Sequence, residues 1–318
     1  MQLRTLGNTG IQVTPVGMGV MAVGRTQLDL PIPEGAAIVR YALESGINFL
    51  DTAQWYKTYP YIKEALKGGG FEPVIASKSL AYSYDEMKAS VDEMRLALDI
   101  DVIDIFLLHE VRTGTDFEEK APAWACLNDL KAKGVVKAIG ISTHYVDVSE
   151  MNATLPESDI LFPLINKDSL GVRYLDGPGT KEAMAAAIKA NRDAGKGVFA
   201  MKVFGGGNLT GNYLESLDYV YNLYGIDSMM VGISATHEID RLVEYAEGRI
   251  DRSYQPDISG KKIRIDSGDC EGCGACIDIC PNKAIDFNDD EVAEVDHGVC
   301  LTCGYCAPAC PVRAIIMY

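Results

Sequence analysis

The residues of this sequence with the clearest chemistry are its cysteines. Eight of the nine lie between positions 270 and 310, in two runs of the form C-x2-C-x2-C-x3-C-P. The runs begin 30 residues apart: Cys270, Cys273, Cys276 and Cys280, then Cys300, Cys303, Cys306 and Cys310. Thiolates at such short intervals hold metal, and they predict a redox or metal centre in a reducing compartment rather than a secreted disulfide framework.

Zinc is the alternative metal that these thiolates could bind. Structural zinc usually takes four ligands from two separated pairs, and it gives no reason for four cysteines at these intervals followed by proline. The run is the one found in bacterial ferredoxins, and about the last 55 residues resemble a dicluster [4Fe–4S] ferredoxin domain. The resemblance implies two clusters with crossed ligands: Cys270, Cys273, Cys276 and Cys310 for cluster one, and Cys300, Cys303, Cys306 and Cys280 for cluster two.

The repeat extends beyond the cysteines. Ile265-Asp-Ser-Gly precedes the first run, and Val295-Asp-His-Gly precedes the second at the same offset. An internal duplication of this kind predicts two similar halves, each with a strand, a ligand loop, a short helix and a strand. We expect residues 256–318 to form this small α+β domain and residues 1–255 to form a separate, larger one.

A second group of reactive side chains lies upstream, at the ends of apolar runs. Asp51, Lys78 and His109 each end a run predicted to be a strand, and Tyr56 follows Asp51 in the next loop. Taken alone, His109 fits a buried core histidine and Asp51 fits a helix cap. Because the carboxyl ends of parallel strands meet on one face, four such residues together favour a reactive site there.

The elements that must position these residues alternate between strand and helix. Apolar, β-rich runs predict eight strands: Val13–Met21, Asn48–Ala53, Val74–Lys78, Ile103–His109, Val136–Ser142, Leu161–Asn166, Val198–Val203 and Ser228–Ile233. Amphipathic stretches predict the helices: Glu34–Glu44, Tyr61–Lys67, Asp85–Leu98, Phe117–Lys133, Val148–Leu155, Lys181–Ala194, Tyr213–Tyr224 and His237–Glu247. Eight β-then-α units predict a (β/α)8 TIM barrel, with a doubly wound open sheet as the alternative.

Three segments carry a family resemblance: Asn48-Phe-Leu-Asp-Thr-Ala-Gln-Trp-Tyr56, Ile75-Ala-Ser-Lys78 and Asp101-Val-Ile-Asp-Ile-Phe-Leu-Leu-His109. They look like signature regions of the aldo-keto reductase superfamily. The opening Arg4–Gly19 also resembles that family, in which it forms a hairpin under the barrel floor. The resemblance covers roughly residues 1–250. With the tail, the chain is similar to a bacterial and archaeal subgroup fused to a ferredoxin domain.

This resemblance implies roles for the four upstream residues. Tyr56 would deliver the proton in a carbonyl reduction. A phenol of ordinary pKa about 10 is too weak an acid for this at neutral pH, so we expect the Lys78 ammonium to lower the pKa of Tyr56. Asp51 would hold Lys78, and His109 would donate a hydrogen bond to the developing alkoxide.

The resemblance also implies a dinucleotide cleft for NADH or NADPH. Ser142, Thr143 and Asn166 correspond to contacts of the nicotinamide carboxamide, and Lys202, Gly205 and Gly206 lie near the usual phosphate position after strand seven. Ser234 and Arg241 lie in the last unit of the barrel. The glycines at positions 205–207 could instead form a plain turn that binds no ligand.

The chain departs from the family pattern in three places. Phe162 replaces a Gln, Met201 lies near the position of a ring-stacking Tyr, and Glu238 stands where a basic residue would bind a 2′-phosphate. A carboxylate at that last position would repel NADPH, although Arg241 could compensate for it. NADPH, NADH and no dinucleotide are therefore all open at this stage.

The amino-acid composition limits the classes of partner that this protein can bind. The formal net charge of −16 argues against nucleic acid and against anionic membrane surfaces. No apolar run is long enough for a membrane-spanning helix and the first residues lack a signal-peptide pattern, so we expect a cytoplasmic protein. The last 68 residues hold six Lys and Arg against twelve Asp and Glu, which suits a basic redox partner protein or simply a soluble surface.

Together these features predict an oxidoreductase that interconverts a small carbonyl and its alcohol, with the two clusters relaying electrons. Hydride transfer moves two electrons together, whereas each cluster passes one. A flavin or organic substrate in the barrel could convert between them, the substrate could take single electrons, or the clusters could lie off the catalytic path. The alternative function is an electron-transfer or docking subunit with an inactive barrel.

Overall fold

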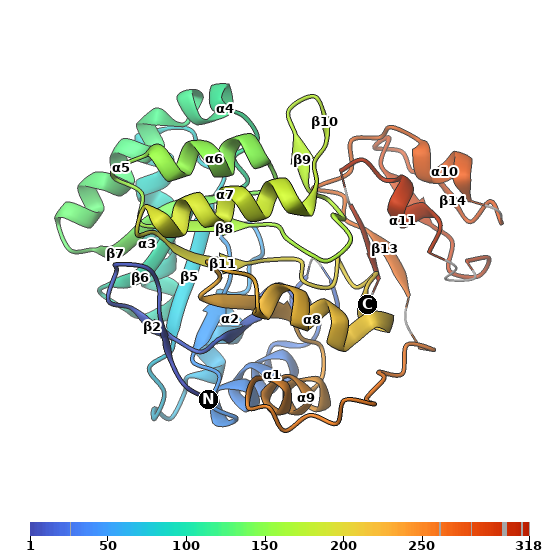
Figure 1. Cartoon of the computed structure of the whole chain (residues 1–318), viewed down its shortest axis with the longest axis horizontal. Coiled ribbons are helices and arrows are strands. Elements are labelled where there is room, and N and C mark those ends of the chain that lie inside the picture. The colour runs from blue at the N-terminus through green and yellow to red at the C-terminus, as the bar shows by residue number, and fades with distance from the viewer. Residues whose placement is uncertain (26, 261, 281, 301–303, 313, 318) are drawn as a thin grey trace.

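The larger part of the chain is a closed barrel of eight parallel strands (Figure 1). The computed structural model describes all residues except 26, 261, 281, 301–303, 313 and 318. In barrel order the strands are β3 (Val16–Gly19), β4 (Phe49–Asp51), β5 (Val74–Ser79), β6 (Ile103–Leu108), β7 (Val136–Thr143), β8 (Ile160–Pro163), β11 (Gly197–Ala200) and β12 (Ser228–Gly232). The predicted TIM barrel is confirmed, and the open-sheet alternative is wrong.

Helices surround the barrel and cover its apolar outer face. They are α1 (Ile32–Glu44), α2 (Tyr59–Ala65), α3 (Tyr84–Leu98), α4 (Gly114–Glu119), α5 (Ala121–Ala132), α6 (Val146–Thr154), α7 (Lys181–Asp193), α8 (Tyr213–Tyr221) and α9 (Thr236–Ala246). Inside the barrel a second apolar cluster is centred on Phe49, Phe162 and Phe199. Phe162 stacks on Phe199 with ring centroids 4.2 Å apart. Within the described residues, no helix is both long and apolar enough to cross a membrane.

Two predicted elements differ from the structure in an instructive way. The first predicted strand, Val13–Met21, divides into β2 (Gln12–Val13), β3 and a 3-10 helix, Val20–Val23. The predicted helix Phe117–Lys133 divides into α4 and α5 at Lys120. Pro122 has no N–H to donate to a preceding turn, so it fits the first turn of a new helix and not the middle of a long one.

The N-terminal hairpin closes the floor of the barrel, as the family resemblance implied. Strand β1 (Arg4–Thr5) pairs with β2, and the turn between them contacts the start of β11. Asn8 N–H donates to Gly195 O at 2.9 Å. A side chain at Gly7 would overlap the backbone of residues 195–197, which explains a glycine there.

The tail is a small domain of two similar halves. Strand β13 (Ile263–Ile265), helix α10 (Ala275–Ile279) and β14 (Ile285–Phe287) form the first half, while β15 (Ala293–Val295), α11 (Cys306–Ala309) and β16 (Ile315–Met317) form the second. The halves exchange strands, because β13 pairs with β16 and β14 pairs with β15, both antiparallel. The predicted duplication is therefore visible in the fold.

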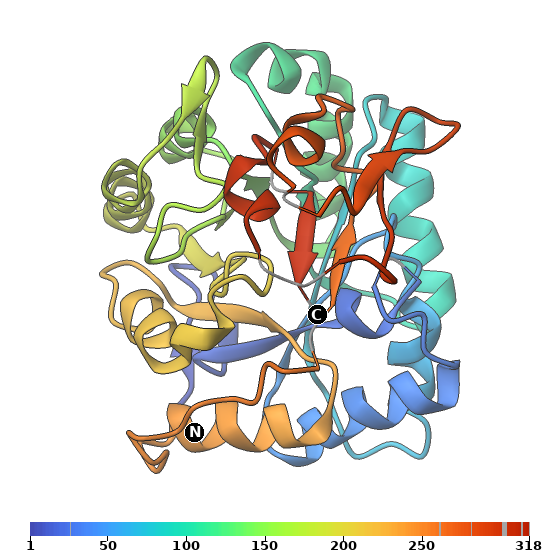
Figure 2. The same cartoon turned by 90° about the vertical axis from the view of Figure 1, so that its right-hand side faces the viewer.

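The tail lies against the mouth of the barrel, where the strands have their carboxyl ends (Figures 1 and 2). Met317 N–H donates to Gly206 O at 2.8 Å, and the guanidinium of Arg264 donates to Gln27 O. Two ion pairs also join the parts, Lys202 with Asp269 at 3.7 Å and Arg112 with Glu271 at 3.9 Å. The tail thus covers the end of the barrel that carries catalytic residues in this fold.

Candidate active site at the barrel mouth

The four predicted catalytic residues come together on three neighbouring strands. Asp51 is the last residue of β4, Lys78 lies next to last in β5, and His109 directly follows β6. These strands are adjacent and parallel, with Asp51 opposite Ala76 and Lys78 opposite Leu107. Tyr56 enters from the loop after β4. The barrel register therefore places Asp51, Lys78 and His109 at one mouth, and the loop after β4 adds Tyr56.

Lys78 and Asp51 form a buried ion pair. The ammonium donates to both carboxylate oxygens of Asp51, at 2.7 and 2.9 Å, and to Thr52 O at 2.8 Å. Lys78 is 1% exposed and Asp51 6%. Burial raises the pKa of the Asp51 carboxyl and lowers the pKa of Lys78, because it disfavours both charges, while their contact works in the opposite direction. All three ammonium donors have acceptors, so Lys78 is fixed in position.

Tyr56 and His109 face each other beside this pair. The Tyr56 hydroxyl lies 3.4 Å from His109 Nε2, and the two rings meet edge to face with centroids 5.5 Å apart. The Lys78 ammonium lies 4.9 Å from the centroid of the Tyr56 ring. A carbonyl oxygen between the hydroxyl and the imidazole would have a hydrogen-bond donor on either side.

The pKa of Tyr56 is shifted in the direction opposite to our expectation. Burial raises it well above 10, and the negative charges of Asp51, Asp269, Asp266 and Glu110 raise it further. The prediction that Lys78 lowers this pKa is wrong for the docked structure, because Asp51 offsets the ammonium and the tail adds carboxylates that the barrel sequence does not contain. The raised pKa keeps the Tyr56 hydroxyl protonated near neutral pH, and it makes this hydroxyl a weaker acid than an ordinary phenol.

His109 is held as a neutral imidazole. Burial lowers its pKa well below 6.5, and the nearby cations of Lys78, Lys120 and Lys202 lower it further. Its Nδ1 is the one buried side-chain nitrogen or oxygen without a hydrogen-bond partner in the part of the chain that the structure describes. His144 follows β7 at the same mouth, and its pKa is also lowered well below 6.5, first by burial and then by Lys202.

These two histidines predict a pH dependence of stability. A folded-state pKa below the unfolded value of about 6.5 means that the unfolded chain binds the proton first, so stability is complete at higher pH and falls as the pH drops below 6.5. At pH 6.0 each histidine is expected to lower the free energy of unfolding by about 0.8 kcal/mol relative to pH 7.5. Anaerobic urea unfolding of His144→Asn at both pH values measures this. In this variant the difference between the two pH values should be smaller by the contribution of His144. His237→Asn, at the exposed start of α9, should keep the full difference.

Four charged residues at the mouth were missed by our sequence analysis. Glu110 bonds to Arg112 at 3.0 Å, and Asp266 and Asp269 of the tail approach Tyr56 closely enough to raise its pKa. Burial raises the pKa of Glu110 and of Asp266, and the charge of Asp269 raises each further. Asp269 could have been suspected from its position directly before Cys270. Glu110 and Arg112 carry no such signal beyond following the strand that ends near His109.

The residues predicted to contact a nicotinamide carboxamide make bonds within the barrel. Ser142 Oγ accepts from Glu110 N–H at 2.9 Å, and Thr143 Oγ1 donates to Val111 O at 2.6 Å. The amide nitrogen of Asn166 donates to Leu170 O, and its oxygen accepts from the N–H groups of residues 168 and 170. All three side chains are buried, and in this state they hold the loops after β6 and β8.

The residues predicted near a dinucleotide phosphate contact carboxylates or the tail. Lys202 pairs with Asp269, and Gly205 and Gly206 lie in a loop that ends against β16. Ser234 donates to Glu238 from its hydroxyl and from its N–H, at 2.8 and 2.7 Å. Arg241 pairs with Glu244 at 2.7 Å.

In the first predicted cysteine set, three thiols lie near enough to Cys276 to affect its pKa. Cys276 is buried, and its pKa is raised first by burial and then by its thiol neighbours Cys310, Cys270 and Cys273. Three of these four come from the first run and one from the second. None of the eight described cysteines, Cys126 included, forms a disulfide with another described cysteine. The donor set and its apolar surroundings fit a cubane cluster.

The second cysteine set is described in part. Cys280, Cys300 and Cys306 lie in the same apolar core, and Ala284 N–H donates to Cys280 Sγ at 3.3 Å. Cys303 lies outside the described residues. No three His, Cys, Asp or Glu side chains among the described residues converge on a single metal ion. In a cubane each thiolate binds a different iron atom.

The cysteine assignment predicts a defined iron content. Anaerobically purified protein should contain about eight iron and eight sulfide per chain. Cys310→Ser should lower both to about half, because the crossed-ligand rule assigns Cys310 to cluster one although it lies in the second run. Cys126→Ser is the control, since Cys126 is a buried residue of barrel helix α5 and lies outside both cysteine runs. Iron and sulfide assays, with electron paramagnetic resonance spectra of the reduced protein, test this assignment. Zinc in place of iron would contradict it.

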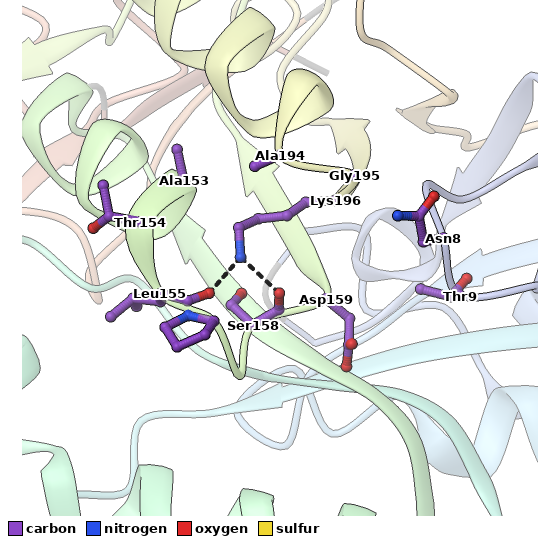
Figure 3. Close-up of a pocket in the computed structure, with 11 residues that line it drawn as sticks. Asn8, Thr9, Ala153, Thr154, Leu155, Ser158, Asp159, Ala194, Gly195 and Lys196 are labelled. Carbon is purple, nitrogen blue, oxygen red and sulfur yellow. Dashed lines mark hydrogen bonds between the residues drawn. The ribbon is translucent and has the colours of Figure 1, made fainter.

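A pocket at the other end of the barrel is not part of this site. It has a volume of about 260 Å³ and lies where β8 and β11 begin, under the N-terminal hairpin (Figure 3). Lys196 crosses it and donates to Leu155 O and Ser158 O. The side chains of Asp159 and Asn8 lie nearby (Figure 3). In a TIM barrel this floor supports stability rather than catalysis.

The fold is a TIM barrel with polar side chains gathered at its mouth and a small cysteine-rich tail. Residues 15–247 match the model of the Aldo/keto reductase family, so the chain belongs to that family. Residues 255–314 match the model of the 4Fe-4S dicluster domain. The predicted fusion of these two parts is confirmed.

Curated relatives match over part of the chain. The chain is 29% identical to L-galactose dehydrogenase of Arabidopsis thaliana over 161 residues, which is 46% of this chain and 50% of that protein. It is 30% identical to 6-dehydroglucose reductase of Novosphingobium aromaticivorans over 181 residues, or 48% of this chain and 56% of that one. The chain therefore spans about half the length of the curated relatives it matches.

Solved structures match the barrel. A putative aldo-keto reductase from Pseudomonas aeruginosa superposes with a TM-score of 0.66 at 25% identity, covering 78% of this chain and 95% of that one. An aldo-keto reductase from Bacillus halodurans, in its holo form, gives a TM-score of 0.62 at 22% identity, covering 78% and 91%. The second likeness shows the fold alone.

Proposed function

We propose that this protein is an oxidoreductase that interconverts a small-molecule carbonyl and its alcohol at the barrel mouth, with electrons relayed by two [4Fe–4S] clusters in the tail. One observation carries the proposal. The residues on either side of Cys270, Asp269 and Glu271, form ion pairs with Lys202 and Arg112 at the same mouth that holds Tyr56 and His109. A cluster held by Cys270 is therefore adjacent to the candidate catalytic residues.

The chain's own residues would bind and protonate the substrate. Reduction of a carbonyl to an alcohol takes up two electrons and two protons. Tyr56 donates one proton to the carbonyl oxygen, and His109 donates a hydrogen bond to that oxygen as negative charge develops. Asp51 holds Lys78 beside the Tyr56 ring, where its charge stabilises the same developing anion. The second proton, which the carbonyl carbon takes up, would come from Glu110 or Asp266, whose raised pKa values favour the protonated form. When bound, the clusters supply electrons singly.

Three candidates could deliver reducing equivalents to the barrel. Members of this family typically use NADH or NADPH, and Ser142, Thr143, Asn166, Ser234 and Arg241 would be the contacts. A flavin has no support from either matched family model. A redox partner protein would reach the clusters through the acidic surface of the tail, where Asp278, Asp286 and Glu294 are exposed. We propose the partner protein as the external donor.

A docking subunit with an inactive barrel is the second candidate function. The tail covers the barrel mouth, which fits a barrel that serves only as a body on which the tail docks. However, an inactive barrel gives no reason to keep Lys78 and Asp51 in a buried pair beside Tyr56, because such a pair is costly to bury. The geometry of the mouth therefore favours the enzyme.

An anaerobic assay separates the two functions. Cluster-loaded protein is given reduced methyl viologen and a panel of aldehydes, ketones and keto sugars, and alcohol products are measured. In the reverse direction it is given alcohols and an oxidised dye. An enzyme forms product with at least one class of substrate, and the Tyr56→Phe variant fails to form it. No turnover in either direction, with full iron content, would support the docking subunit instead.

A further inference from the structure

The glycine loop after β11 is occupied by the end of the tail. Gly205, Gly206 and Gly207 all have positive φ, which presents their backbone to a close neighbour. Gly206 O accepts from Met317 N–H at 2.8 Å, and a Cβ at Gly207 would lie 1.8 Å from Met317 O. The amide of Asn208 reaches Ile315 O at 3.4 Å. Strand β16 thus lies against this loop with direct backbone contact at Gly206 and Gly207.

The positive charge of this loop is also neutralised by the tail. The Lys202 ammonium lies 3.7 Å from the Asp269 carboxylate, and both side chains are about four-fifths buried. In TIM barrels the loops after strands seven and eight form the usual phosphate site. Here β11 is strand seven, so Asp269 places a carboxylate beside the cation that a phosphate would use.

In the loop after strand eight, a different carboxylate occupies the hydrogen-bond donors that a phosphate would use. Glu238 Oε2 accepts from Ser234 N–H, Ser234 Oγ and Ala235 N–H, at distances of 2.7 to 3.2 Å. These donors lie at the start of α9, where a phosphate would otherwise bind. Arg241, on the same helix, pairs with Glu244 at 2.7 Å. Both phosphate-binding loops of the barrel therefore hold anions supplied by this chain.

We propose that the docked tail and the pyrophosphate of a dinucleotide exclude each other, so that the intact, cluster-loaded chain binds neither NADH nor NADPH. A dinucleotide would have to displace β16 from Gly206 and Gly207 and overcome the repulsion of Asp269 and Glu238. The reducing equivalents of the proposed reaction then enter through the tail, from a one-electron donor. This inference deepens the proposed function, but its test does not depend on activity.

Equilibrium dialysis under anaerobic conditions tests the binding directly, since it is unaffected by the colour of the clusters. The full chain with its complete iron content is dialysed against NADH and, separately, NADPH. We expect no saturable binding of either nucleotide up to about 1 mM. Saturable binding of one nucleotide per chain overturns the inference and leaves the proposed carbonyl chemistry intact. Absence of both binding and activity supports the inference and contradicts the proposed function.

Hydrogen exchange tests the docking contact itself. Gly207→Ala places a methyl group against Met317 O, and we expect the amide of Met317 to exchange at least about tenfold faster. Gly248→Ala is the matched control, because Gly248 has a similar positive φ but no neighbour within 4 Å of the added Cβ. It should leave Met317 unchanged. Equal exchange of Met317 in wild type and Gly207→Ala means that β16 does not lie on this loop, which overturns the inference.

Discussion

Replacing Lys78 with Met is expected to abolish turnover and to lower the free energy of unfolding by about 3–5 kcal/mol. The loss of stability arises because Asp51 would remain buried without its partner, and an unpaired buried charge is far costlier than the pair. The loss of activity arises because the ammonium beside the Tyr56 ring disappears. Urea unfolding and the viologen-linked assay measure the two effects separately.

A double variant separates stability from chemistry. Lys78→Met with Asp51→Leu removes both charges, and it should recover most of the lost stability while turnover stays absent. Lys196→Met is the matched control at the opposite end of the barrel, because Lys196 is also buried but bonds only to backbone carbonyls. It should retain turnover. Recovery of turnover in the double variant would show that the ion pair has no part in the reaction.

Replacing Tyr56 with Phe is expected to lower kcat by about 10²–10⁴-fold, the usual contribution of a positioned proton donor. The ring remains, so its contacts with Lys78 and His109 persist and only the hydroxyl is lost. Because this hydroxyl makes one long contact, 3.4 Å to His109 Nε2, the free energy of unfolding should change little. Steady-state kinetics under anaerobic conditions measure the rate.

Tyr59→Phe is the control for this substitution. Tyr59 lies three residues further along, but its hydroxyl points into the barrel wall and bonds Ser77 Oγ at 2.8 Å. This variant should keep its kcat and lose about 0.5–1.5 kcal/mol of stability. If Tyr56→Phe and Tyr59→Phe have equal rates, the proton comes from another group, and Glu110 would be the next to test.

The barrel and its reactive mouth could be predicted because both depend on local patterns. Each of Asp51, Lys78 and His109 stands at the end of an apolar run, and parallel strands bring such ends together. Similarly, the cysteine spacing predicts a crossed set around Cys276, because in the ferredoxin pattern the ligands of one cluster come from two runs with a fixed repeat. The predicted helix boundaries were less accurate. The amphipathic periodicity continues across Pro122, so the sequence pattern did not reveal the break between α4 and α5.

The docking of the tail could not be predicted from the sequence. The duplication tells which strands pair within the tail, but nothing in it says which end of the barrel the tail covers. The contacts that decide this are single, widely separated residues such as Asp269 with Lys202 and Met317 with Gly206. The pKa of Tyr56 was predicted in the wrong direction for the same reason, because Asp266 and Asp269 come from a part of the chain more than 200 residues away.

A single-turnover experiment tests the central claim most directly. The clusters are reduced under anaerobic conditions, excess reductant and all nucleotide are removed, and a carbonyl substrate identified in the assay is added. If the clusters feed the barrel mouth, their absorbance returns to the oxidised form and about one alcohol forms per chain, because two clusters hold two electrons. If the clusters stay reduced and alcohol appears only when NADH or NADPH is added, the account is contradicted.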